Sequence, residues 1–385
     1  MEYFFTEEQR LIKELAGKIS REKIPPVALK YDEEQIFPWD IIKILADSDL
    51  CGVYIDEKYG GLGGGILEMC LVVEELSRAC GGMALSFAGT ALGAFPIILF
   101  GNDRQKERYL CEIASGKKLA AFSLTEANAG SDAAGIQTSA VPEGGGYVLN
   151  GTKQWITNGG EADIYTVIAC TNKQKGARGL SAFIVERDTP GFSFGKKENK
   201  MGIRASATRE LVFDNCRIPR ENLLAREGMG FIAAMKTLDK TRPAIAAQAL
   251  GIAQGAFEEA RTYSRQRVQF GQPISSFQAI QHILADMAIQ IEAARCLLYQ
   301  TCRHIDSGAA SISKESAMAK VMASDTAMRV TVDAVQILGG YGYMKEYPVE
   351  KMMRDAKITQ IYEGTNQIQR NIIALELIKG FCPKK

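Results

Sequence analysis

The sequence predicts an α+β protein of several domains, with an all-α N-terminal domain, a middle β domain and a C-terminal four-helix bundle. The chain has 385 residues, which is more than one hydrophobic core usually organises. Apolar residues recur at helical spacing towards both ends, whereas the middle holds short β-rich runs between Gly, Pro and Asn clusters. We therefore expect a helical domain over residues 1–120, an antiparallel barrel or sandwich over 121–228 and a helical bundle over 229–385.

The first predicted helix begins with a capping box. Thr6 with Gln9 has the spacing at which a side-chain oxygen and a glutamine amide satisfy the free N–H groups of a helix start. Leu11, Leu15 and Ile19 follow at helical spacing, so we expect them to form the buried face.

A long uncharged stretch, residues 79–102, has the length of a membrane span. It is diluted by five glycines, Ser86, Thr90, Pro96 and Asn102. We therefore expect a buried helix with small residues that leave room beside it, and no membrane span. The glycine-rich run Glu57–Gly65 contains no G-x-G-x-x-G and is expected to be a loop.

The middle of the chain contains several strand-like runs. In "YVLNGTKQWIT", Asn150-Gly151 separates two of them, and Asn-Gly is the strongest short hairpin signal. Further runs are "IYTVIAC", "SAFIVE" and "RELVFDNCRI". Short strands at this spacing predict a small antiparallel barrel or sandwich.

The helical period returns after residue 229. Apolar positions predict helices over residues 231–256, 280–298, 313–338 and 368–378, and Gly339-Gly340 would end the third. These helices form the predicted four-helix bundle.

Composition argues against several classes of protein. Lys plus Arg is 46 and Asp plus Glu is 45, so nucleic acid and anionic membranes have no electrostatic basis for binding. Nine scattered cysteines without C-x-x-C are typical of reduced cytoplasmic chains. His282 and His304 lack zinc-like spacing, so no metal is expected. The N-terminal "MEYFFTEEQR" lacks the basic and apolar regions of a signal peptide.

Six stretches in order closely resemble the acyl-CoA dehydrogenase family: "AFSLTEANAGSDAAG", "TKQWITNG", "DKTRPAIAAQALG", "RQRVQFGQPISSFQAIQ", "DAVQILGGYGY" and "YPVEKMMRDAKITQIYEGTNQIQR". "DKTRP" and "IYEGT" are most similar to the medium- and short-chain branch. The resemblance implies FAD held between the β domain and the bundle. It also implies oxidation of an acyl-CoA to a trans-2-enoyl-CoA, an electron-transfer flavoprotein as acceptor, and a homotetramer.

Glu363 in "IYEGT" is the base by this resemblance, and its backbone N–H, with a flavin ribityl hydroxyl, would polarise the thioester carbonyl. A carboxylate removes an α-proton well where an apolar surround, here partly Tyr362, raises its basicity. Gly364 would leave room for the thioester, and Asn366 with Gln369 would cap the next helix. Without the resemblance, a loop acid is typically a solvated surface residue.

The resemblance implies a further set of ligand-binding residues. Phe122, Leu124 and Thr125 would meet the flavin ring, Trp155, Ile156 and Thr157 would lie along its face, and Ser131 would reach CoA. Arg267, Phe270 and Gln278 would reach the FAD diphosphate and adenine from a neighbouring subunit, and Gln336, Gly339, Gly340, Thr365 and Gln367 would contact the same cofactor. From the residues alone, these positions are also consistent with a polar turn, strand packing, a surface ion pair and a helix C-cap.

Asp239 and Arg242 match family residues near the CoA pantetheine and adenine, although Asp-x-x-Arg on a helix is usually a solvated pair. Thr241 occupies the position where some branched-chain members carry their base, and a threonine cannot serve as one.

Two departures from the family concern the substrate. Leu375 replaces a CoA-binding arginine of medium-chain members, and Met83 lies roughly where decarboxylating members place an arginine. A neutral short- or medium-chain, or small cyclic, acyl group is therefore favoured. An oxygen-using relative and a catalytically silent flavoprotein remain the alternatives.

Overall fold

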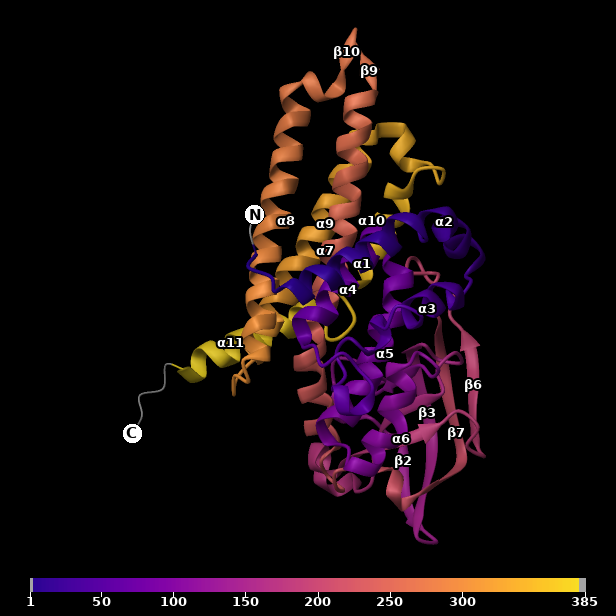
Figure 1. Ribbon diagram of the computed structural model, residues 1–385. Coiled ribbons are helices and arrows are strands. Elements are labelled where there is room, and N and C mark those ends of the chain that lie inside the picture. The colour runs from indigo at the N-terminus through magenta and orange to yellow at the C-terminus, as the bar shows by residue number, and fades with distance from the viewer. Residues whose placement is uncertain (1–2, 381–385) are drawn as a thin grey trace.

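The computed structural model describes residues 3–380, and its elements change in type along the chain as the sequence predicts (Figure 1). The N-terminal helices are α1 (Glu7–Glu22), α2 (Pro25–Glu34), α3 (Trp39–Ala46), α4 (Ile66–Ala79), α5 (Gly81–Phe100) and α6 (Asp103–Ala114). The strands of the middle region are β1 (Ala120–Ser123), β2 (Ser139–Glu143), β3 (Gly146–Thr157), β4 (Ile164–Cys170), β5 (Leu180–Glu186), β6 (Phe192–Lys197), β7 (Thr208–Pro219) and β8 (Leu223–Leu224). The C-terminal elements are α7 (Gly230–Gln266), a short hairpin of β9 (Val268–Gln269) and β10 (Gln272–Pro273), α8 (Gln278–Asp306), α9 (Ser313–Leu338), α10 (Pro348–Ile358) and α11 (Asn366–Gly380).

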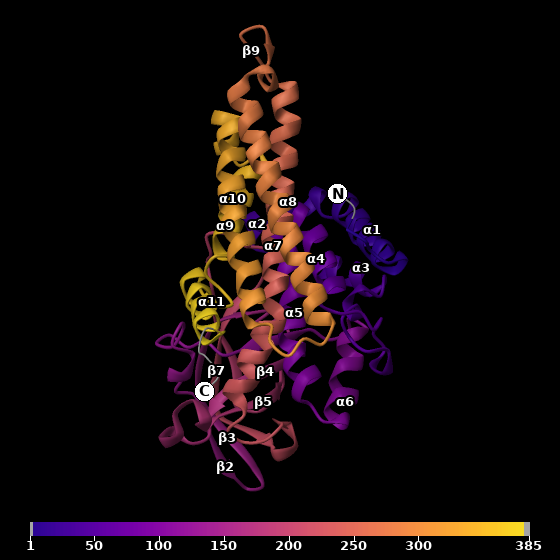
Figure 2. The ribbon, with the colours of Figure 1, turned by 90° about the vertical axis from the view of Figure 1, so that its left-hand side faces the viewer.

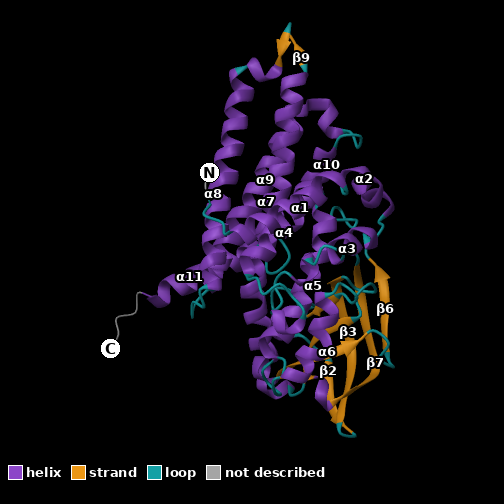
Figure 3. Ribbon diagram, in the orientation of Figure 1, coloured by secondary structure: helices purple, strands orange, loops and turns teal. Residues whose placement is uncertain are grey.

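The middle strands form one eight-stranded sheet at one end of the molecule (Figure 3). Its order is β6-β7-β3-β2-β4-β5-β8, with β1 paired to β4. Most pairs are antiparallel, as expected, but β1–β4 and β2–β4 are parallel. The chain enters the sheet at β1 directly from the N-terminal helices, since α6 ends at Ala114 and β1 begins at Ala120.

The hairpin prediction at Asn150-Gly151 is wrong. β3 runs unbroken through both residues, and the turn between β2 and β3 lies at Gly144-Gly145, whose φ angles are +59° and +83°. Positive φ at both central residues is the primed turn geometry that glycine accommodates without strain. Gly151, with φ +145°, marks instead a register shift between β3 and β7.

α1 begins with the predicted capping box, since the Gln9 N–H donates to Thr6 Oγ1 at 3.2 Å and the Thr6 N–H donates to Gln9 Oε1 at 3.1 Å. Its buried face differs from the expected one, because Ile12, Ala16 and Ile19 are buried. Leu11 and Leu15 are exposed. Ile12 and Ala16 have the same four-residue spacing as Leu11 and Leu15, so the sequence pattern alone did not decide which of the two pairs is buried.

The uncharged stretch forms α5, a core helix between the sheet and the bundle. Among the described residues it is the one helix long and apolar enough to cross a membrane, and 78% of its apolar window is buried inside the protein. Its glycines allow close packing: a Cβ at Gly93 would lie 2.4 Å from Ala121 N, and one at Gly89 would lie 2.7 Å from Thr157 Cγ2. α5 therefore lies directly against β1 and the end of β3.

The C-terminal helices form the predicted bundle, in which α9 contacts α7, α8, α10 and α11 (Figure 2). The 37 residues of α7 span about 55 Å at 1.5 Å per residue. This helix runs from the sheet, beside α5, to the β9–β10 hairpin at the far tip. One end of α7 thus lies beside the sheet, while the other lies at the far tip of the bundle.

Candidate active site

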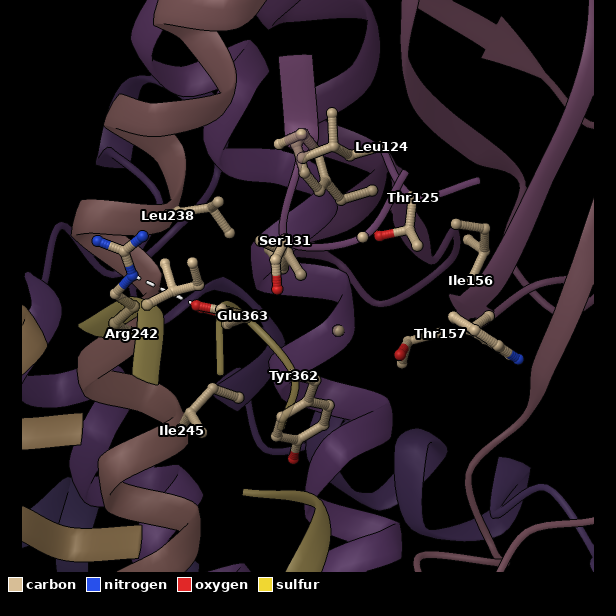
Figure 4. Close-up of a pocket in the computed structure, with 18 of the residues that line it drawn as sticks. Leu124, Thr125, Ser131, Ile156, Thr157, Leu238, Arg242, Ile245, Tyr362 and Glu363 are labelled. Atoms are coloured by element: carbon tan, nitrogen blue, oxygen red, sulfur yellow. Dashed lines mark hydrogen bonds between the residues drawn. The ribbon is translucent and has the colours of Figure 1, made fainter. Parts of the chain in front are cut away.

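A cavity of about 320 Å³ lies where α5, the β1–β3 region, α7 and the loop before α11 meet (Figure 4). Glu363 lies on one side of it, and Thr125, Ile156 and Thr157 lie on the other. The lining also includes Leu85, Ala88, Gly89 and Leu92 of α5, Met235, Leu238, Arg242 and Ile245 of α7, and Phe122, Leu124, Ser131, Trp155, Tyr362 and Gly364. The wall is mainly apolar, with a carboxylate and a few hydroxyls facing inward.

The backbone around Glu363 is held in an uncommon conformation. Glu363 has φ +51° and Gly364 has φ +91°, so two consecutive residues are left-handed. Such a conformation is costly for a glutamate and persists where the surroundings hold it. The φ of Gly364 favours glycine in the loop itself and not only as space for a ligand, and a Cβ there would in addition lie 2.5 Å from Gln369 Nε2 and displace it.

Three side chains hold this loop by its carbonyl groups. Arg242 Nε donates to Glu363 O at 3.4 Å, as the dashed line in Figure 4 shows. Gln369 Nε2 lies 3.0 Å from both Glu363 O and Gly364 O, and Lys320 Nζ donates to Gly364 O at 3.0 Å. These donors satisfy both carbonyls and so fix the orientation of the two peptides.

The Glu363 carboxylate lies part-buried at the cavity wall, and among the described residues it accepts one hydrogen bond, from Thr241 Oγ1 to Oε2 at 3.0 Å. Burial raises the pKa of Glu363 to about 7, although Thr241, Arg242 and Lys320 act in the opposite direction. An acid with this pKa is partly ionised at neutral pH and can accept or release a proton there.

Lys320 is a functional-site residue that sequence reasoning missed. It is fully buried on α9, and burial lowers its pKa to about 7. Its Nζ also donates to Asn366 Oδ1 at 2.8 Å, and Ser324 Oγ lies 2.9 Å from Asn366 Nδ2. Ser316, Lys320 and Ser324 form a polar row at four-residue spacing on an otherwise alanine-rich helix, and that row was the available signal.

The predicted helix cap at Asn366 and Gln369 is wrong. The N–H of Ile368 donates to Thr365 Oγ1 at 3.2 Å, so Thr365 caps α11. Asn366 instead bonds to α9, and Gln369 supports the loop as described above. Thr365 therefore has a structural role, and Gln367 is exposed at the start of α11.

Asp239 and Arg242 form a buried pair and not a solvated one. Arg242 Nη1 lies 2.6 Å from Asp239 Oδ1, and Arg242 is 3% exposed. Pro243 has no N–H to donate to Asp239 O, four residues earlier, and Ser316 Oγ donates to that carbonyl instead at 2.6 Å. The proline thus allows α9 to be tied to α7 beside the cavity.

A buried ion pair fixes the opposite wall. Lys153 Nζ lies 2.8 Å from Glu126 Oε1 and donates to Leu124 O at 2.9 Å. Glu126 also accepts from the N–H groups of Gln137 and Thr138. Burial opposes ionisation of Glu126, but Lys153 and these donors lower its pKa below the usual value. The pair pins the Leu124–Thr125 segment to β3.

The Trp155–Thr157 segment is shaped by a β-bulge. The register between β3 and β7 shifts between Lys153 and Ile156, and Trp155 has φ +58°, which is a genuine outlier for a bulky residue. Trp155 is 55% exposed, so it is not ordinary core, whereas Ile156 is buried. The bulge directs Thr157 into the cavity beside Thr125 (Figure 4).

The remaining predicted cofactor residues lie elsewhere in the chain. Arg267, Gly339 and Gly340 line a separate hollow of about 450 Å³. Arg267 follows Arg242 by 25 positions, which is about 37 Å along a helix. Phe270, in the tip hairpin, is 93% exposed, and Gln278 begins α8 while Gln336 lies near the end of α9. These six residues therefore do not line the cavity of their own chain.

The two positions at which the sequence departs from the family pattern, Leu375 and Met83, both lie outside the cavity lining. Leu375 is 56% exposed on α11, and Met83 is buried in α5 and does not line the cavity.

Comparison with known proteins accounts for the whole architecture. Family models for the N-terminal, middle and C-terminal domains of acyl-CoA dehydrogenase match residues 6–117, 121–216 and 228–378. The chain therefore belongs to the acyl-CoA dehydrogenase family, whose members are FAD-dependent oxidoreductases of fatty acid metabolism. The family resemblance of the motifs is confirmed.

Individual members of the family are similar to this chain over nearly its whole length. The short-chain-specific acyl-CoA dehydrogenase of Megasphaera elsdenii is 49% identical, over 98% of this chain and 100% of the relative. The solved structure of butyryl-CoA dehydrogenase from the same organism is 49% identical, with a TM-score of 0.96 over 98% of this chain and 100% of that one. A chain solved in a study of the electron transferring flavoprotein of Acidaminococcus fermentans is 48% identical, with a TM-score of 0.96 and the same coverage.

Proposed function

We propose that this protein dehydrogenates a neutral short-chain acyl-CoA to the trans-2-enoyl-CoA, with Glu363 as the base. The carrying observation is the placement of Glu363 across an apolar cavity from Thr125 and Thr157, with a pKa near 7. A surface carboxylate would have neither the cavity nor the raised pKa. The relatives named for short-chain and butyryl substrates support the substrate class.

The cavity wall formed by the sheet fits an isoalloxazine ring. The hydroxyls of Thr125 and Thr157 line the cavity and form no hydrogen bond within residues 3–380. The bulge leaves the Trp155 ring half-exposed beside them, where it can cover a planar group. We propose that Phe122, Leu124, Thr125 and the Trp155–Thr157 segment hold the flavin here. FAD, when bound, supplies the acceptor for the hydride that leaves the β-carbon.

Residues of this chain accept the α-proton and bind the thioester. Glu363 takes the α-proton, because its burial makes it basic enough to do so at neutral pH. The donors on the carbonyls of Glu363 and Gly364 hold the loop so that the Glu363 N–H is available to the thioester oxygen, where negative charge develops. We propose that Ser131, which lines the cavity, meets CoA, and that the buried Asp239–Arg242 pair acts near it.

Hydrogen bonds behind Tyr362 would limit the length of the acyl chain. Tyr362 lines the cavity, and its hydroxyl donates to Gln248 Oε1. Gln248 Nε2 in turn donates to Gly81 O at 2.9 Å, which ties α7 to the start of α5. We propose that this bridge closes the cavity behind Tyr362. Arg242 is the one arginine in its lining among the described residues, and Asp239 already holds it, so a carboxylate at the end of the acyl chain would have no free partner.

We propose that Arg267, Phe270, Gln278, Gln336, Gly339 and Gly340 complete the FAD site of another copy in a homotetramer. Arg267 lies about 37 Å along the helix from the cavity residue Arg242, so these two arginines would contact different regions of a cofactor. The accessible Phe270 and the Arg267 hollow provide an aromatic ring and a guanidinium for a dinucleotide. Thr365 and Gln367 remain proposed contacts.

We also propose the division at residues 1–120, 121–228 and 229–385, a cytoplasmic location and an electron-transfer flavoprotein as acceptor. The related chain solved in the study of the Acidaminococcus fermentans electron transferring flavoprotein supports this acceptor.

The test is anaerobic titration of the FAD-loaded protein with acyl-CoA thioesters from propionyl to decanoyl, together with isobutyryl, glutaryl and cyclohexanecarboxyl thioesters. We expect short neutral thioesters to bleach the flavin band, and Glu363→Gln to abolish bleaching while CoA-ester binding persists. Absence of bleaching by every thioester, with normal reduction by dithionite, would instead support a silent flavoprotein. Rapid peroxide formation in air would support the oxygen-using alternative.

A further inference from the structure

The hydroxyl of Thr241 is the one side-chain hydrogen-bond donor on the Glu363 carboxylate among the described residues. Thr241 lies on α7, is 1% exposed, and places Oγ1 3.0 Å from Glu363 Oε2. No hydrogen bond holds Oε1 within residues 3–380, and Glu363 lines the cavity. The two carboxylate oxygens thus have different surroundings, one anchored in the protein and one unanchored.

Thr241 has a second acceptor within reach. Its Oγ1 lies 3.2 Å from Thr237 O, one helical turn earlier. A threonine hydroxyl carries one proton and donates to one acceptor at a time. When the carboxyl group turns towards a ligand, the hydroxyl can donate to Thr237 O, so no buried donor is left without a partner. The anchor can therefore be released at little cost.

We propose that Thr241 is a positioning residue for the base, holding Glu363 Oε2 so that Oε1 is presented to the cavity. This inference rests on the proposed role of Glu363. In the step itself, the α-C–H bond breaks and its proton goes to the Glu363 carboxylate, while the electron pair left on the α-carbon forms the Cα=Cβ double bond. The β-C–H bond breaks with it, and FAD, when bound, would accept that hydride. Thr241 keeps its own proton throughout.

The other charged and titratable groups around Glu363 serve different purposes. Arg242 on α7 is paired with Asp239 and donates to the backbone of Glu363, not to its carboxylate. Lys320 on α9 donates to Gly364 O and Asn366, and Tyr362 donates to Gln248. The cavity lining from α5 contributes Leu85, Ala88, Gly89 and Leu92, none of which is titratable. A substitution at Thr241 leaves the charges of these groups unchanged, so it alters only the hydrogen bond to the Glu363 carboxylate.

The decisive variant is Thr241→Val, which keeps the shape of the side chain and removes the donor. A hydrogen bond to a charged group favours the charged form, so its loss should raise the Glu363 pKa by about one unit. Thr241→Ser should restore the wild-type value. Thr237→Val is a matched control, because Thr237 is equally buried on the same helix and its hydroxyl has no partner within residues 3–380.

The first measurement is an infrared titration of the Glu363 carboxyl band in the FAD-loaded protein, with the band assigned by its absence in Glu363→Gln. We expect the midpoint of this titration to rise by about one pH unit in Thr241→Val and to stay at the wild-type value in Thr241→Ser and Thr237→Val. The acidic limb of kcat/KM for butyryl-CoA should move by the same amount. A midpoint in Thr241→Val equal to that of the wild type would overturn the proposal.

A replacement variant keeps the test decisive if Thr241→Val does not fold. Thr241→Cys then takes its place, since a thiol is a weak donor and should shift the midpoint in the same direction. An unshifted midpoint in that variant would also overturn the inference. Failure of all thioesters to bleach the flavin would refute the proposed dehydrogenation, but the infrared titration would still decide whether Thr241 controls Glu363. A purely structural role for Thr241 would lower stability without moving the midpoint.

Discussion

Replacement of Glu363 by glutamine should stabilise the protein in a strongly pH-dependent way. Burial raises the pKa of Glu363 from its ordinary value of 4.5 to about 7. Between these two values the folded protein retains a proton that the unfolded chain has lost. The free energy of unfolding therefore falls as the pH rises through this window, and the loss is complete above the folded pKa. Glutamine has no proton to lose and can still accept from Thr241 through its Oε1.

The size of the effect follows from the shift. A rise of about 2.5 pKa units corresponds to about 3 kcal/mol at 1.36 kcal/mol per unit. With an unfolding entropy of about 2.1 cal/mol/K per residue, the full chain should melt about 4 °C higher for this gain. We expect this increase for Glu363→Gln at pH 8.5 and an increase of less than about 1 °C at pH 5.

The assay is calorimetry of the FAD-loaded wild type and variant at both pH values. Glu22→Gln, at an exposed position at the end of α1, is the control for loss of one negative charge. It should change Tm equally little at both pH values. Equal Tm shifts for Glu363→Gln at pH 5 and pH 8.5 would refute a desolvated carboxylate at this position. A lower Tm at pH 8.5 would indicate that the ionised carboxylate stabilises the fold.

Three other substitutions test the surroundings of the cavity. Lys320→Met should lower stability by about 2 kcal/mol, because Gly364 O and Asn366 Oδ1 lose their lysine donor, and calorimetry should show a lower Tm. An unchanged Tm would contradict this. Gln248→Ala should raise the ratio of kcat/KM for hexanoyl-CoA over butyryl-CoA about tenfold, since room for two methylenes is worth about 1.6 kcal/mol. A constant ratio would place the end of the cavity elsewhere. Lys153→Met should weaken FAD binding about tenfold in a fluorescence titration, because the Leu124 segment loses a hydrogen bond of about 1.5 kcal/mol; unchanged affinity would contradict the positioning role of the pair.

The elements that the sequence predicted well are those with long, regular patterns. The helical periods at residues 231–256, 280–298, 313–338 and 368–378 lie in α7, α8, α9 and α11, because a period repeated over several turns outweighs local propensity. The short helix α10 was not predicted. At Asn150-Gly151 a local turn signal was overridden by pairing of β3 along its length with β7. The true turn had an equally clear signal in Gly144-Gly145.

The sequence by itself determined the order of the helical and β-rich regions and the family, and the resemblance to that family indicated the candidate base, because periodicity and motifs depend on residue types along the chain. The tertiary structure decided what surrounds that base. Thr241, Arg242 and Lys320 lie 122, 121 and 43 positions before Glu363, and only the packing of α7 and α9 against the loop brings them to it. The pKa of a carboxyl group depends on burial and on neighbours within a few ångströms, and no local pattern in the chain encodes either.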